Sequence, residues 1–337
     1  MTILTSRNEL VSMIQARDAF LDSHLRMDAS SATRPRRTSG NAFTAASAAR
    51  RPTRAGSLEE IVVGAGVDVS NKTINVYLRE SPDGMSIPAR IGDFPACYVT
   101  SGVFRAAVSS ALTNPRRRCR PARPGRSIGP PSETAGTLGA WVQSGDKVYA
   151  LSAGHVLTDF GKFAPGAVIR QPGLLDQPDV LENNVIAKLS QASALDPSPA
   201  AENRLDAALA EVVNGGHVGR RFLAPIGRLR GCEHLPPRRD LEVQKIGRTT
   251  GHRRGRVTDC QVTVKVEFDG QPYRFVDQIF IEGLSDPFAT GGDSGALVLG
   301  RRSTRPIALL MAVSDTGITV ANRFDLVQKT LGFTLLV

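Results

Sequence analysis

The sequence has few cysteines and no apolar run long enough to cross a membrane. Cys97, Cys119, Cys232 and Cys260 lie far apart and form no CxxC pair, which argues against a zinc site and against a dense disulfide scaffold. The first ten residues, MTILTSRNEL, lack the apolar core of a signal peptide. We therefore expect a cytoplasmic protein with reduced thiols, no cofactor, no metal ion and no membrane partner.

Aromatic residues and lysines are also scarce. Aromatic residues make up 5% of the chain, and only seven of its 42 basic residues are lysines, so arginine carries most of the net charge of +10. Many arginines fall in two runs, 34–54 and 105–126. Nucleic-acid-binding segments often interleave basic with aromatic residues that stack on bases, and these runs lack that pattern. Solvated linkers are the favoured interpretation, and a nucleic-acid or acidic partner is the alternative.

Composition divides the chain into five segments. An amphipathic helix is predicted within 1–30, an Arg-rich linker over 31–57, a small α/β or β subdomain over 58–110, a basic Pro-rich connector over 111–130 and a larger domain over 131–337. The larger domain contains many short apolar runs separated by turn residues, which predicts a mainly β barrel or sandwich.

A short helix is predicted to close the larger domain. Asn322 is a favourable residue for its N-terminal cap, and Gly332 for its end.

One stretch, ATGGDSGALVLG at 289–300, places Ser294 between glycines and before an apolar run. Such a stretch forms either a tight turn or the loop of a nucleophilic serine. A serine hydroxyl needs a base within hydrogen-bond reach, and the base needs an orienting acid.

Five histidines are candidates for the base. His155 follows an apolar strand and small residues in YALSAGHVL, which leaves room for a partner, although a buried structural histidine at a strand end fits equally well. The other four, His24, His217, His234 and His252, lie in segments typical of the surface.

For the acid, Asp206 heads the apolar segment DAALAEV. A carboxylate beside a buried strand is costly unless it is hydrogen-bonded, so an imidazole partner would account for it. A capping role is the alternative. Around the serine, the N–H groups of Gly292 and Ser294 can bind an oxyanion. Asp293 takes no part in proton transfer, and we expect it to hold the loop through an ion pair or hydrogen bonds.

The order His155, Asp206, Ser294 is the chain order of the chymotrypsin type. These three blocks resemble those of trypsin-like serine peptidases. Longer stretches, among them KIGRTTGHRRGRV and RPARPGRSIGPPSETAGTLGAWV, resemble a bacterial group related to the plant NARROW LEAF 1 peptidases. The resemblance covers roughly 60–335. It implies a mainly β, chymotrypsin-like double barrel over 131–337, preceded by the subdomain and the N-terminal helix, and a hydrolase that acts on protein or peptide substrates.

The resemblance also implies a substrate pocket, with Phe288 near its base and Ser314 in one wall. No acidic residue stands at position 288, so a preference for Lys or Arg is not supported. The residue after the histidine is Val156 rather than a cysteine, and no activation site precedes the barrel domain, so Asp293 has to be satisfied internally or the activity has to be regulated.

Two alternatives to a peptidase stay open. The chain is either a silent binding or scaffold protein on a peptidase fold, or an Arg-mediated nucleic-acid binder. Self-cleavage in the Arg-rich connectors is a further expectation for the peptidase.

Overall fold

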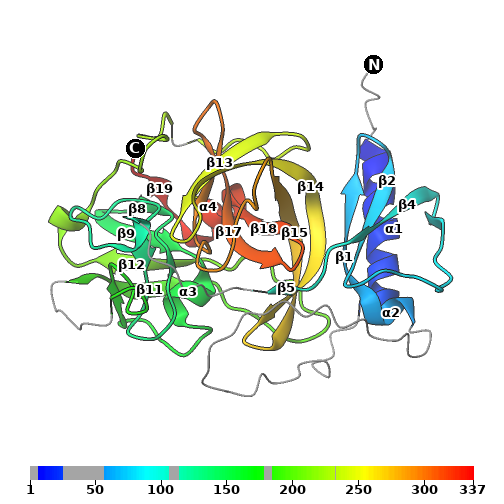
Figure 1. The fold of residues 1–337 in the computed structure, drawn as a ribbon, viewed down its shortest axis with the longest axis horizontal. Helices are drawn as coiled ribbons and strands as arrows, with labels where there is room; N and C mark the ends of the chain where they lie inside the picture. Colours follow the sequence, from blue (N-terminus) through cyan, green and yellow to red (C-terminus); the bar gives the residue numbers. More distant parts are fainter. Residues whose placement is uncertain (1–6, 26–56, 106–113, 178–183, 232) are drawn as a thin grey trace.

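The computed structural model describes residues 7–25, 57–105, 114–177, 184–231 and 233–337. The predicted linker at 31–57 lies almost entirely outside these ranges, as does Cys232. The predicted fold class is confirmed: the chain is mainly β, with a helix near the N-terminus (Figure 1). None of the helices within the described ranges is long and apolar enough to cross a membrane.

The first barrel is built on a six-stranded antiparallel sheet in the order β10-β11-β12-β9-β8-β19. Its core contains Leu138, Trp141, Leu157, Ile169 and Ile186, all fully or almost fully buried. A short helix, α3, packs against β11 and β12. The elements are β6 (Ser127–Ile128), β7 (Gly136–Thr137), β8 (Ala140–Ser144), β9 (Lys147–Ser152), α3 (Gly154–Thr158), β10 (Val168–Arg170), β11 (Val185–Ala192), β12 (Ala208–Val212) and β19 (Thr334–Leu335).

The second barrel follows the order β13-β16-β17-β18-β15-β14, and β13 also pairs with β14, which closes the ring of strands. Apolar residues from these strands fill its interior. β14 and β15 are longer than the other strands and form a hairpin that extends beyond the barrel. The strands are β13 (Glu242–Gly247), β14 (Gly251–Phe268), β15 (Gln271–Gly283), β16 (Leu297–Gly300), β17 (Pro306–Ser314) and β18 (Thr319–Arg323).

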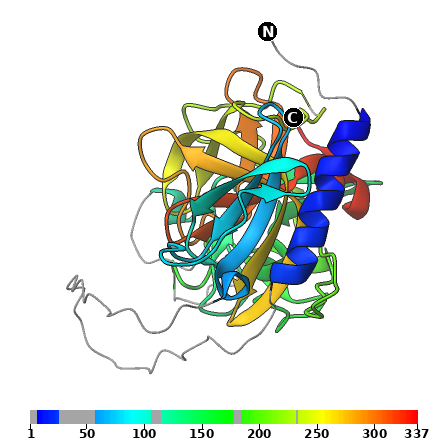
Figure 2. The same cartoon turned by 90° about the vertical axis from the view of Figure 1, so that its right-hand side faces the viewer.

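The N-terminal part adds strands to this second barrel. β1 pairs with β14 through Gly64↔Val264, so the order continues β14-β1-β2-β4-β3 in one eleven-stranded sheet. Helix α1 lies along the outer face of these strands and buries Phe20 and Leu21 (Figures 1 and 2). The elements are α1 (Arg7–His24), α2 (Leu58–Ile61), β1 (Val62–Asp68), β2 (Thr73–Leu78), β3 (Arg90–Ile91), β4 (Phe94–Thr100), β5 (Phe104–Arg105) and a 3-10 turn, η1 (Asn114–Arg116).

The closing helix, α4, spans Phe324–Leu331 and ends at Gly332, which has a φ of 65° as a left-handed cap requires. Its N-cap is Arg323, not the predicted Asn322. The Asn322 side chain is fully buried and instead bonds the backbone of Asp206. Asn322, which the sequence predicts as a helix cap, therefore links the two barrels beside the candidate site.

Candidate active site

His155 lies on α3, directly after β9, and is 4% exposed. Its ring packs against two aromatic rings, with centroid separations of 5.4 Å to Phe160 and 5.0 Å to Phe268, and these two rings are themselves 6.0 Å apart. A cavity of about 440 Å³ opens beside it, lined in part by Phe160, Phe268, Tyr273 and Leu195. The histidine thus lines a cavity with both aromatic and polar walls between the first barrel and the β14–β15 hairpin.

Asp206 lies just before β12, and its residue surface is fully buried. One carboxylate oxygen accepts the backbone N–H of His155 at 2.8 Å, and the other lies 2.5 Å from Nδ1 of the His155 ring. Because an ionised carboxylate only accepts, we assign the ring proton to Nδ1, which leaves Nε2 free to act as a base. The predicted acid and the predicted base are thus in direct contact.

Two further residues shape this contact. A Cβ at Gly154 would lie 2.6 Å from the carboxylate of Asp206, so the close approach requires glycine. Asn322 accepts the Asp206 backbone N–H at 3.0 Å and donates to its carbonyl at 3.3 Å. Gly154 of the first barrel and Asn322 at the end of β18 therefore both position the His155–Asp206 pair.

Ser294 lies in the loop between β15 and β16 and is 3% exposed. Its Oγ donates to the carbonyl of Met311 at 2.9 Å. Within the described ranges no hydrogen bond joins Ser294 to His155. The loop nevertheless packs against the segment before His155, since a Cβ at Gly295 would lie 2.9 Å from the N of Ala153. The structure thus joins two of the three predicted residues by a hydrogen bond and places the third nearby in another hydrogen-bonded position.

The backbone before Ser294 fits the predicted oxyanion site. Gly292 has a φ of 87°, which a residue with a side chain rarely adopts. Its carbonyl accepts from Thr137 Oγ1 at 3.0 Å, which fixes the orientation of its peptide. Over the described part of the chain, the N–H groups of Gly292 and Ser294 have no hydrogen-bond acceptor. Two unpaired donors beside a serine are what a developing oxyanion needs.

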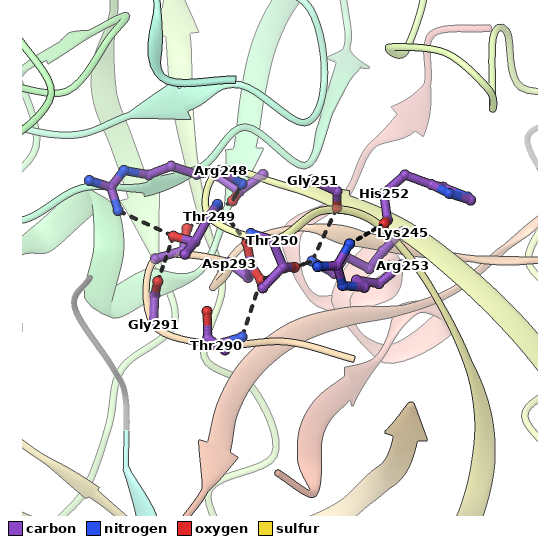
Figure 3. Close-up of polar contacts among 12 residues, drawn as sticks. Lys245, Arg248, Thr249, Thr250, Gly251, His252, Arg253, Thr290, Gly291 and Asp293 are labelled. Carbon is purple, nitrogen blue, oxygen red and sulfur yellow. Dashed lines mark hydrogen bonds and ion pairs between the residues drawn. The ribbon is translucent and has the colours of Figure 1, made fainter. Parts of the chain in front are cut away.

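Asp293 is fully buried, and so is its ion-pair partner Lys245 on β13, whose Nζ lies 2.9 Å from the carboxylate (Figure 3). The same carboxylate accepts the N–H of Thr249 at 2.8 Å, the hydroxyl of Thr250 at 2.6 Å and the N–H of Thr290 at 3.2 Å. Lys245 also donates to the hydroxyl of Thr250 and, at 3.3 Å, to a backbone carbonyl.

Charge in this cluster is balanced internally. Burial alone would raise the pKa of Asp293, but Lys245 and the hydrogen-bond donors together hold it below its usual value. Burial lowers the pKa of Lys245, and the charge of Asp293 opposes that shift. The expectation that Asp293 is satisfied internally matches this arrangement: an ammonium from the chain interior holds the Ser294 loop.

A second buried ion pair borders the other side of the loop. Arg248 is fully buried and donates two hydrogen bonds of 2.6 Å to the carboxylate of Asp176. A Cβ at Gly292 would lie 2.3 Å from Nη1 of Arg248, so this guanidinium is in contact with the candidate oxyanion peptide. Arg116 adds a hydrogen bond of 3.2 Å to Thr249 Oγ1.

The two residues expected at the substrate pocket lie in different surroundings. Phe288 is fully buried in the core of the second barrel, where it packs with Val257, Ile281 and their neighbours. Ser314 is 6% exposed at the end of β17, and its Oγ accepts the backbone N–H of Ile318 at 3.0 Å. In this structure Phe288 therefore belongs to the barrel interior.

Three buried charged residues at this loop, Lys245, Arg248 and Asp176, are not among the residues predicted from the sequence. Lys245 had a detectable signal, because a lysine between Gln244 and Ile246 in a barrel strand is costly on the interior face unless an acid faces it. Asp176 had none, because it lies in a segment whose residues are typical of an exposed loop.

Comparisons with known proteins find similar chains among solved structures. No family model and no curated protein matches the chain. Among solved structures, it is similar to serine proteases. Thermobifida fusca protease A is 14% identical (64% of this chain, all of that one, TM-score 0.45). Cellulomonas bogoriensis chymotrypsin is 17% identical, and the match covers 63% of this chain and 97% of that one with a TM-score of 0.44. Nocardiopsis protease is 14% identical, and the match covers 64% of this chain and 100% of that one with a TM-score of 0.46. At these identities and TM-scores the likeness says nothing about the chemistry of the site, which follows from its own residues.

Proposed function

We propose that the protein is a serine endopeptidase that cleaves protein or peptide substrates through an acyl-enzyme. The observation that carries the proposal is the contact of His155 with Asp206, beside a serine loop whose N–H groups at Gly292 and Ser294 have no acceptor among the described residues. The resemblance of its sequence to the NARROW LEAF 1-related group supports the same assignment.

In the proposed reaction, the Ser294 hydroxyl rotates from the Met311 carbonyl toward Nε2 of His155. His155 takes the hydroxyl proton as Oγ attacks the substrate carbonyl, and Asp206 stabilises the imidazolium that forms. The N–H groups of Gly292 and Ser294 bind the oxyanion. His155 then returns the proton to the leaving amine, and a water molecule, activated in the same way, hydrolyses the acyl-enzyme.

Before it can react, the Ser294 hydroxyl must give up its hydrogen bond to the carbonyl of Met311. A serine held by a carbonyl is not yet a nucleophile, so this contact is the specific observation that favours the second candidate, a silent peptidase-fold binding protein. The two candidates differ in whether Ser294 reacts.

Labelling with a fluorophosphonate tests the proposal. We expect covalent labelling of the wild type at Ser294, located by peptide mass spectrometry, and none of the Ser294→Ala variant. Asp206→Asn should lower turnover by about 10⁴-fold with the fold unchanged, because the imidazole tautomer is then wrong. A folded wild type that stays unlabelled across several probes and pH values would establish the silent candidate instead.

A further inference from the structure

A short strand from the N-terminal part lies at the mouth of the second barrel. β5 pairs with the end of β14 in parallel, through Val266↔Phe104 and Glu267↔Arg105. On its other side it pairs antiparallel with the end of β17, through Ser314↔Phe104 and Val313↔Arg105. The label β5 in Figure 1 marks this place, between the N-terminal strands and the barrel.

The direction of this strand is the important point. β17 contains Met311, whose carbonyl bonds the Ser294 hydroxyl. Because β5 is antiparallel to β17, going from Phe104 to Arg105 moves from opposite Ser314 to opposite Val313, that is, toward Met311 and Ser294. An extended peptide held by backbone hydrogen bonds on this edge of β17 would therefore run toward the nucleophile, as a substrate strand added to a sheet must do.

The strand is held firmly in that place. Phe104 is fully buried, with its ring centroid 5.0 Å from that of Phe280. Asp315 accepts the N–H of Val103 at 3.3 Å and pairs with Arg105 at 3.0 Å. Just upstream, the carbonyl of Ser101 accepts the hydroxyl of Thr316 at 2.8 Å. Backbone pairing, an apolar anchor and an ion pair thus fix β5 from three sides.

We propose that β5 is an autoinhibitory strand that occupies the peptide-binding edge of β17. This inference rests on the proposed peptidase function. It explains why the edge at Val313–Ser314 is covered in a chain whose serine and histidine are each less than 5% exposed. A polypeptide substrate can lie along β17 only after β5 has left, whereas a small reagent needs only Ser294 and the oxyanion donors.

A reversible lock tests the proposal. Arg105 and Glu267 are directly opposite on β5 and β14, and neither belongs to the catalytic machinery. Neighbouring strands lie about 4.7–4.9 Å apart, which is within the range of Cα separations that a disulfide spans. In the Arg105→Cys/Glu267→Cys variant, oxidation should lower kcat/KM for an extended peptide at least tenfold, and reduction should restore it. The single Arg105→Cys variant and the wild type, treated identically, control for the native cysteines. Labelling by a small fluorophosphonate that has no peptide portion should change less than twofold.

A second variant releases the strand. Phe104→Ala removes the buried anchor and should raise kcat/KM for the extended peptide at least tenfold over the wild type, again with small-probe labelling nearly constant. If the probe labels Ser294 but locking and release leave peptide cleavage unchanged, the autoinhibition is wrong while the peptidase function stands. If no variant is labelled and none cleaves, both are overturned. The lock remains informative even if Phe104→Ala does not fold.

Discussion

The ammonium of Lys245 lies 2.9 Å from the carboxylate of Asp293, and both side chains are completely buried. The two residues come from different elements, β13 and the loop before β16, so the pair ties the Ser294 loop to the barrel wall. Both partners belong to the second barrel. The loop conformation is therefore a property of the folded barrel itself.

Removing one partner of this pair should be costly. Lys245→Met keeps most of the side-chain volume but leaves the Asp293 carboxylate buried without its counter-charge. We expect the free energy of unfolding to fall by about 3–5 kcal/mol and labelling of Ser294 to be lost. Urea unfolding and probe labelling measure the two effects.

The matched control for this variant is Lys147→Met. Lys147 also pairs with a carboxylate, that of Glu211 at 2.9 Å, but both side chains are exposed to solvent. Its unfolding midpoint should stay close to that of the wild type, because exposed ion pairs contribute little. Equal effects of the two substitutions would show that burial of the Lys245 pair has no special role.

The Lys245–Asp293 pair predicts that folding stability depends on pH in opposite directions in the wild type and in Lys245→Met. In the wild type the folded pKa of Asp293 lies below its usual 3.8, so its contribution is complete above that pH and is lost as the pH falls further. Without Lys245, burial would raise that pKa, and the charged carboxylate would then destabilise the fold as the pH rises.

The stability difference between the wild type and Lys245→Met should therefore be largest at neutral pH and shrink toward pH 3.8. Urea midpoints measured over a pH series test this. The double variant Lys245→Met/Asp293→Asn, which has no charge to bury, should show neither the reversal nor the full loss of stability. A pH-independent difference would contradict the assignment to Asp293.

The sequence predicts a catalytic residue best where the features that mark it lie within a short stretch of the chain. The glycines around Ser294, the small residues before His155 and the apolar run after Asp206 each marked a position, and the structure brings His155 and Asp206 together. The sequence could not show which hydrogen bond Ser294 makes, because its partner Met311 lies on a separate strand. Asn322 illustrates the same limit, because a residue typical of a helix cap bonds the backbone of Asp206 across the barrels.

The contact between Gly154 and Asp206 provides a steric test. A methyl group at position 154 would meet the carboxylate at 2.6 Å, and the backbone there is not left-handed, so the effect is one of space alone. We expect Gly154→Ala to displace Asp206, destabilise the fold by about 1–3 kcal/mol and lower kcat more than it changes KM. Gly215→Ala is the control, since no atom lies within 4 Å of the added carbon. A fully active Gly154→Ala variant would show that the Asp206 position is not critical.

The carboxylate of Asp176 accepts two hydrogen bonds from the buried guanidinium of Arg248. Asp176→Asn would remove the negative charge of this buried pair beside Gly292, at a cost of about 3–5 kcal/mol. Because Arg248 touches the candidate oxyanion peptide, we expect kcat to fall as well, measured with the same peptide substrate. Asp240→Asn, at an exposed pair with Arg256, is the matched control and should change neither quantity. Loss of stability with kcat preserved would show that Arg248 supports the fold without positioning the Gly292 peptide.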